Sequence, residues 1–198
     1  MGTTTKMAIP YPEATGLVKD GWEDMKDIAT QIDAKSGLVL LNTTSFTGVA
    51  STSLTQGIFN SSYRNYFIRI QFTGATASGS LTFRFRTTGT DNSNANYQKQ
   101  ELSSSSTTVT GARSTNQTSF TISSLQTDFN IADIYLYNPQ IVSNTGFQIF
   151  TAIVPATTGA LTDHQVGGFN ATTQFDAMSF ISTGANITGY YQVYGYND

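Results

Sequence analysis

From Leu38 onward, apolar and polar residues alternate with a period of two, and this pattern constrains the fold more than any other feature. The segments YRNYFIRIQF (residues 63–72) and LTFRFR (residues 81–86) show it most clearly. Successive side chains of a β-strand point to opposite faces of a sheet, so the alternation predicts strands with one face in a core. Segments rich in Gly, Ser and Asn separate these strands, as turns do.

Similar segments recur along the rest of the chain. We expect further strands at residues 38–41, 107–110, 119–122, 131–137, 146–154, 167–174, 176–181 and 187–196. About ten short strands at this spacing, without a second helical segment, predict an all-β fold: an antiparallel β-sandwich of jelly-roll type. The polar run at residues 103–108 is interpreted as a mobile loop between strands.

The composition fits this fold and argues against several classes of function. Charged residues make up only 12% of the chain, about half the usual share, whereas Thr, Ser and Asn number 32, 20 and 13. There is no Cys and one His, so a zinc site is not expected. A net charge of -3 without a basic stripe argues against a nucleic-acid partner. No signal peptide or membrane-spanning run is evident, so we expect cytoplasmic synthesis and no membrane insertion.

The first 36 residues follow a different pattern from the rest. Nine of the 23 charged residues fall between Glu13 and Lys35. A helical period predicts a helix from Gly21 to Ala34, and Gly37 is placed to end it. We therefore divide the chain into an N-terminal arm and helix, residues 1–36, and a β-sandwich domain, residues 37–198.

The expected helix carries one apolar seam. Its members are Trp22, Met25, Ala29 and Ile32, at spacings of three, four and three. Such a short helix is marginal in water, so the seam should be buried against something. It can lie on its own sandwich, or it can form an assembly interface with other copies or another protein. Pro10 and Pro12 make the preceding arm extended, which favours the assembly interface.

Residues suited to catalysis are sparse. His164 adjoins Asp163, but adjacency in sequence does not orient one side chain on the other, and no GxSxG motif accompanies them. Glycoside hydrolysis needs two facing carboxylates, and the acidic residues of the sandwich are scattered along the sequence. We therefore expect no enzymatic activity, no catalytic residue, no resident metal and no cofactor.

Two other segments are candidates for an exposed binding loop or face. The first is the loop GTDNSNANY, whose oxygen-bearing residues are Asp91, Asn92, Asn94 and Asn96. It lacks the pattern of an EF-hand, so it is either a weak calcium site or, preferably, a loop tip held by its own hydrogen bonds.

The second segment is the C-terminal strand GYYQVYGYND. Its alternation places Tyr190, Tyr194 and Tyr196 on one face, and Tyr191 and Val193 on the other. A row of tyrosines can stack on sugars, because the ring covers apolar C–H groups while the hydroxyl stays hydrated. The same row can instead form a contact between sheets or subunits, which is the preferred interpretation.

Three segments resemble proteins of tailed bacteriophages. The opening PYPEATGLVKDGWEDMKDIATQIDAKSG is similar to the N-terminal segment of tail-fibre-like and minor structural proteins of marine and other phages. The segments FRFRTTGTDNSNANYQKQ and FDAMSFISTGANITGYYQVYGYND are similar to virion proteins with a β-sandwich body.

The resemblance implies a structural virion protein, synthesised in the host cytoplasm, of tail-fibre or tail-tip type. It implies a homotrimeric knob attached to other phage virion proteins through residues 1–36, with host cell-surface polysaccharide as a further partner. Because the chain lacks a long repetitive stalk, capsid decoration or a head fibre is the alternative. An alternative of another class is a free carbohydrate-binding module, for which the N-terminal helix has no evident purpose.

Overall fold

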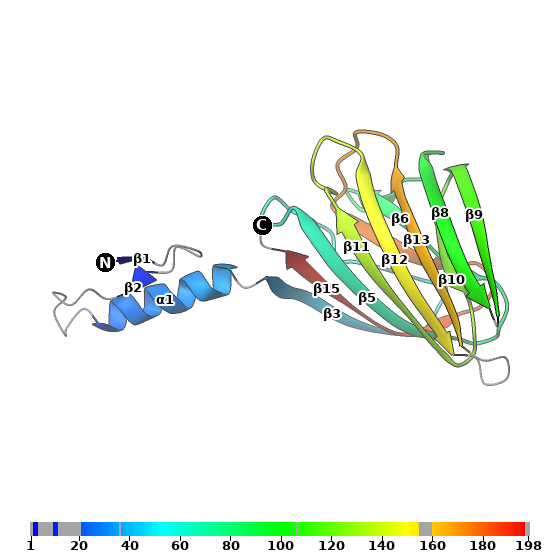
Figure 1. Ribbon diagram of the computed structural model, residues 1–198, viewed down its shortest axis with the longest axis horizontal. Helices are drawn as coiled ribbons and strands as arrows, with labels where there is room; N and C mark the ends of the chain where they lie inside the picture. Colours follow the sequence, from blue (N-terminus) through cyan, green and yellow to red (C-terminus); the bar gives the residue numbers. More distant parts are fainter. Residues whose placement is uncertain are drawn as a thin grey trace.

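A computed structural model describes residues 2–3, 10–11, 21–35, 37–105, 107–154 and 160–196 of the chain. It shows two antiparallel sheets packed face to face, with a helix to one side (Figure 1). The predicted all-β sandwich is therefore confirmed. No helix in these ranges is long and apolar enough to cross a membrane.

The larger sheet contains eight strands in the order β3-β15-β5-β11-β12-β13-β8-β9. Their bounds are β3 Leu38–Val49, β15 Ile187–Tyr196, β5 Asn65–Gly74, β11 Phe129–Tyr137, β12 Thr145–Val154, β13 Leu161–Phe169, β8 Tyr97–Ser105 and β9 Thr108–Gln117. Every neighbouring pair is antiparallel. Strands β3 and β9 form the two edges of this sheet.

The smaller sheet contains five strands and lies behind the larger one in Figure 1. Its order is β10-β6-β14-β4, and β7 pairs with β6. The bounds are β10 Phe120–Ser124, β6 Ser80–Thr87, β14 Ala177–Ser182, β4 Ser51–Ser53 and β7 Thr90–Asp91. A jelly roll has eight strands in total, so the finer jelly-roll description is not confirmed by sheets of eight and five.

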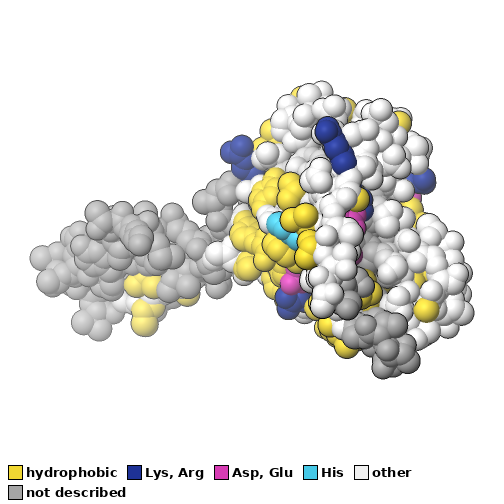
Figure 2. All heavy atoms as spheres, turned by 45° about the vertical axis from the view of Figure 1, so that its right-hand side comes forward, with side chains coloured by type: hydrophobic (Ala, Val, Ile, Leu, Met, Phe, Trp, Pro, Cys, Tyr) yellow, Lys and Arg dark blue, Asp and Glu magenta, His cyan; other side chains and the backbone are white. Residues whose placement is uncertain are grey.

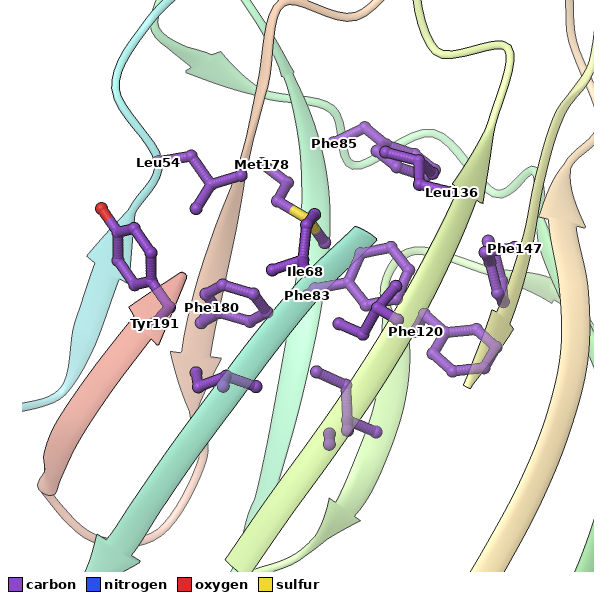
Figure 3. Packing of buried hydrophobic residues seen from close by; sticks show 14 of the residues in the cluster. Leu54, Ile68, Phe83, Phe85, Phe120, Leu136, Phe147, Met178, Phe180 and Tyr191 are labelled. Carbon is purple, nitrogen blue, oxygen red and sulfur yellow. The ribbon is translucent and has the colours of Figure 1, made fainter. Parts of the chain in front are cut away.

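The core is a layer of aliphatic and aromatic side chains between the sheets (Figure 3). Phe83 of β6 lies at the centre of this layer: its ring centroid is 5.1 Å from that of Phe120 and 5.3 Å from that of Phe147. Phe85 stacks on Phe175 with a centroid distance of 4.6 Å. Offset and edge-to-face rings contribute attraction beyond their buried area, so this layer joins the two sheets strongly.

The N-terminal segment contains helix α1, Gly21–Lys35, and the short paired strands β1, Gly2–Thr3, and β2, Pro10–Tyr11. The helix begins where the sequence predicts and ends one residue later. Figure 1 shows α1 projecting from the end of the sandwich at which β3 begins. The arm is extended where it is described, at β1 and β2. Residues 1, 4–9 and 12–20, which include Pro12, lie outside the described residues.

Two sequence predictions of local structure are wrong. Ser103–Ser105 belong to β8 and Thr108 to β9, so residues 103–108 are mostly strand ends rather than a loop. The strand expected at residues 167–174 is instead β13, which runs from Leu161 to Phe169. It pairs with β12 and β8 over its length, and this pairing overrides the loop-like composition of the segment.

The Tyr97 hydroxyl joins the core to the loop that follows β7. It accepts a hydrogen bond from the backbone N–H of Phe85 at 2.9 Å and donates one to the carbonyl of Asn92 at 2.9 Å. Tyr97 is fully buried, and this burial raises its pKa well above the usual value for a tyrosine. The neutral hydroxyl thus provides a hydrogen-bond partner for the Phe85 N–H in β6 and for the Asn92 carbonyl, which directly follows β7.

We predict that Tyr97→Phe lowers the free energy of unfolding by about 1–3 kcal/mol, because two buried backbone groups lose their partner. Urea denaturation followed by circular dichroism measures the change. Tyr137→Phe, in which the ring is 39% exposed, is the control and should change stability much less. Equal stability of Tyr97→Phe and the parent protein would contradict a structural role for this hydroxyl.

Candidate interaction face

Exposed hydrophobic side chains gather on one surface, the side of the eight-stranded sheet that faces away from the core. We call this surface the outer face. It carries nine large hydrophobic residues that are 39–67% exposed: Leu38, Leu40, Leu102, Val109, Phe129, Tyr137, Phe150, Val154 and Val166. Their strand register places all nine on the same side of the sheet. Figure 2 shows hydrophobic side chains clustered around the one histidine, His164, on this side.

An aromatic band crosses the middle of the outer face. It consists of Tyr194, Phe67, Tyr135, Phe150 and His164, from β15, β5, β11, β12 and β13 respectively. The centroid distances between successive rings are 5.7, 5.1, 6.3 and 4.4 Å. The band is therefore continuous across five neighbouring strands, and its members are positioned by cross-strand register.

An ion pair lies beside the aromatic band. Arg69 donates from Nε and Nη2 to the two carboxylate oxygens of Asp133, at 2.7 Å each. This hydrogen bonding raises the pKa of Arg69, and the guanidinium also lies 5.6 Å from the centroid of the Phe67 ring. The two charges satisfy one another, so they add no net charge to the band.

The histidine does not form a catalytic pair with its neighbour. His164 lies in β13, although the composition around it is typical of a loop, and its ring stacks on Phe150 with an interplanar angle of 5°. The amide nitrogen of Gln148 lies 2.9 Å from Nε2 of His164. Asp163 points to the opposite face, where it accepts a hydrogen bond from Thr151 at 3.3 Å. Because successive residues of a strand point to opposite faces, the side chains of His164 and Asp163 lie on different sides of the sheet.

The loop after β7 uses its own polar groups internally. Asp91 accepts a hydrogen bond from Ser179 at 2.6 Å and lies 3.1 Å from Nε of Arg86. Asn92 accepts one from the backbone N–H of Asn94, and the carbonyl of Asn96 accepts one from the backbone of Asn170. The loop is therefore held by a hydrogen bond of its own, between Asn94 and Asn92, and by contacts of Asp91 and Asn96 with other segments.

The loop and the tyrosine row are on different layers of the sandwich. Asp91, Asn92 and Asn94 line a hollow of about 260 Å³ beside the five-stranded sheet, whereas the tyrosines belong to the eight-stranded sheet. Across the part of the chain that the structure describes, no three His, Cys, Asp or Glu side chains converge as metal ligands.

The C-terminal strand has the alternation that the sequence predicts. Tyr191 and Val193 are buried in the core, while Tyr190, Tyr194 and Tyr196 are half-buried on the outer face. The hydroxyl of Tyr190 donates to Gln71 at 3.0 Å, and Tyr194 belongs to the aromatic band. Partial burial raises the pKa of Tyr196.

The other members of the aromatic band are not among the residues that sequence reasoning selected. Phe67, Tyr135 and Phe150 occupy the positions that should be polar if only one side of the sheet were covered. Aromatic residues at such positions are the signal that could have identified this face. Their contacts with one another depend on the order of the strands, which the sequence does not show.

The seam of α1 is only partly described. Met25 is 65% exposed and Ala29 is exposed. The side chains of Trp22 and Ile32 lie outside the described residues. The described half of the predicted assembly interface is therefore accessible to a partner in the isolated chain.

We predict that two phenylalanines of one strand differ sharply in their effect on stability. Phe147 of β12 is 1% exposed and Phe150 is 44% exposed. Phe147→Ala should lower the free energy of unfolding by about 3–5 kcal/mol, through lost burial and a cavity. Phe150→Ala should cost about 1 kcal/mol, the value of its ring contacts. Thermal and urea denaturation of both variants measure the difference, and similar losses would contradict this assignment of faces.

Comparisons with known proteins do not identify the chain. No protein-family model matches the sequence, and no curated protein matches it.

Proposed function

We propose that this protein is a non-enzymatic structural component of a tailed-phage virion. In this proposal three copies associate, the sandwich forms a knob on the particle, and residues 1–36 attach it to other virion proteins. The resemblance of the N-terminal and C-terminal segments to phage proteins supports the location. The capsid-decoration or head-fibre alternative assigns the same architecture to a different part of the virion.

The observation that carries the proposal is the placement of α1. The helix lies beside the sandwich rather than over either sheet (Figure 1), with Met25 and Ala29 exposed. A 15-residue helix is marginal in water unless its apolar seam is buried. A partner that covers the seam would stabilise the helix. In this proposal, other copies of the chain are that partner.

The acidic side chains support a structural rather than a catalytic role. Asp133 pairs with Arg69, Glu101 pairs with Lys99, and Asp176 accepts a hydrogen bond from the backbone of Thr88 at 2.9 Å. Asp133 lies in β11, Glu101 in β8, and Asp176 directly before β14. A glycosidase needs two carboxyl groups free to act across a cleft, whereas each of these three carboxylates already has a partner.

A specific feature favours the carbohydrate-binding module as the second candidate. At the β8–β9 end of the outer face, a hollow of about 260 Å³ is lined by Gln98, Gln100, Arg113 and Val166, among others. Amide and guanidinium groups next to apolar surface are the combination that sugar rings require.

Met25→Asp tests the assembly function. We expect the parent protein to sediment at three times the 21.4 kDa mass of one chain, and Met25→Asp to dissociate because a charge enters the buried seam. Thr30→Asp is the matched control, since it adds the same charge to an exposed position on another side of the helix. A monomeric parent protein, or Met25→Asp that assembles like Thr30→Asp, would rule out this role for α1.

A glycan array separates the two candidates. If the protein acts only in assembly, we expect no glycan to be retained by the full-length chain at micromolar concentration. The carbohydrate-binding alternative predicts retention that Gln100→Ala weakens at least tenfold, while Asn94→Ala, in the loop beside the smaller sheet, leaves it unchanged. Retention with that pattern would replace the structural proposal with the binding-module one.

A further inference from the structure

We infer that the outer face of the eight-stranded sheet is a contact surface between copies of this chain. This inference rests on the proposed self-association and extends it from α1 to the sandwich itself. It assigns a second copy of the protein as the occupant of the outer face. Three features of the described residues lead to that assignment: the size of the apolar surface, its charge and its connection to α1.

The exposed apolar area is sufficient for a stable contact. Nine side chains, each exposing about half of its surface, present on the order of 800 Å², which equals one partner's share of a standard protein interface. This area is summed over side chains of six strands, whereas the largest single apolar patch of a typical monomer covers roughly 300–600 Å². The outer face therefore has the size of a partner-covered surface.

The smaller sheet provides an internal comparison. Its outward positions carry the polar residues Thr82, Arg84 and Ser179, of which Thr82 and Ser179 are buried within the chain, and none of the large exposed hydrophobics in the described ranges lies on it. Both sheets bury their inner sides in one core, so the difference is not required by the sandwich itself. Of the two sheets, the larger one alone exposes large hydrophobic side chains among the described residues.

The charge of the outer face argues for a neutral, apolar partner. At its centre, Arg69 and Asp133 neutralise each other through two hydrogen bonds. Arg113 lies at the far edge, on β9. An acidic or basic partner would gain little here, whereas interfaces between identical subunits are the more apolar class.

The outer face begins close to α1 along the chain. Only residues 36 and 37 separate the helix from β3, whose Leu38 and Leu40 point to the outer face and are about half exposed. These leucines neighbour Tyr196 and Tyr194, the first aromatic residues of the face. Helices that associate around an axis would bring the β3 ends of the copies together, so the same copies can cover both surfaces.

Single lysines on the outer face test this inference. Leu40→Lys and Phe150→Lys should each weaken association about 30-fold or more, the fold-change expected for loss of an interface hot spot. Ser51→Lys is the matched control, because Ser51 is an exposed strand residue of the smaller sheet. Sedimentation across a dilution series gives the association constants, and circular dichroism confirms that each variant is folded. Face variants that associate as tightly as Ser51→Lys, or a parent protein that is monomeric throughout, would overturn the inference.

Thiol labelling provides a second measurement that does not disturb the fold. The chain contains no cysteine, so Leu40→Cys and Ser51→Cys each carry a single thiol. At concentrations where the protein associates, Leu40→Cys should react with a maleimide at least tenfold more slowly than after dilution, and Ser51→Cys at an unchanged rate. Equal rates at both concentrations for Leu40→Cys would overturn the inference.

The face variants and Met25→Asp fail in distinguishable ways. If Met25→Asp dissociates while Leu40→Lys and Phe150→Lys remain assembled, the helix mediates assembly and the outer-face inference is wrong. If only the face variants dissociate, the outer-face inference holds and the role of α1 is wrong.

Discussion

The aromatic layer between the two sheets is the interaction on which the rest of the structure depends. Phe147 lies 4.4 Å from Phe120 and 5.3 Å from Phe83, centroid to centroid, so one residue of the larger sheet contacts two strands of the smaller one. A shift of one residue in any strand would exchange its two faces and remove such rings from the core. The core therefore fixes the register, and the register determines which residues form the outer face.

The strands at the middle of the larger sheet are apolar on both sides. Phe67, Tyr135 and Phe150 lie on the outer face of strands whose inner residues, such as Ile68 and Ile134, are fully buried. A sheet with one solvated side shows apolar and polar residues in strict alternation, whereas a sheet covered on both sides does not. The aromatic residues at outer positions of β5, β11 and β12, which interrupt an otherwise alternating pattern, are thus the physical basis for treating the outer face as a surface with a partner.

Sequence alone predicted the parts of the fold in which apolar burial dominates. The strands ending at Tyr137, Val154 and Tyr196 were placed within two residues, because they alternate large apolar residues. Strands β8 and β13 lacked that signal: Lys99 and Gln165 face inward and are held by an ion pair and a hydrogen bond. Of the candidate site, the tyrosine row was predictable, but the stacking of His164 on Phe150 depends on which strands are neighbours.

The ion pair within the outer face is compatible with burial by a partner. Taking a lone charge out of water is costly, but Arg69 already donates two hydrogen bonds to Asp133 and packs on Phe67 within its own chain. A partner need not supply a counter-charge, because the charges of Arg69 and Asp133 already neutralise one another. An identical copy can cover the pair without adding charge, because its own Arg69 and Asp133 are already paired within its chain. The pair then limits which partners fit, because a charged surface placed against it would lose hydration without gaining a new contact.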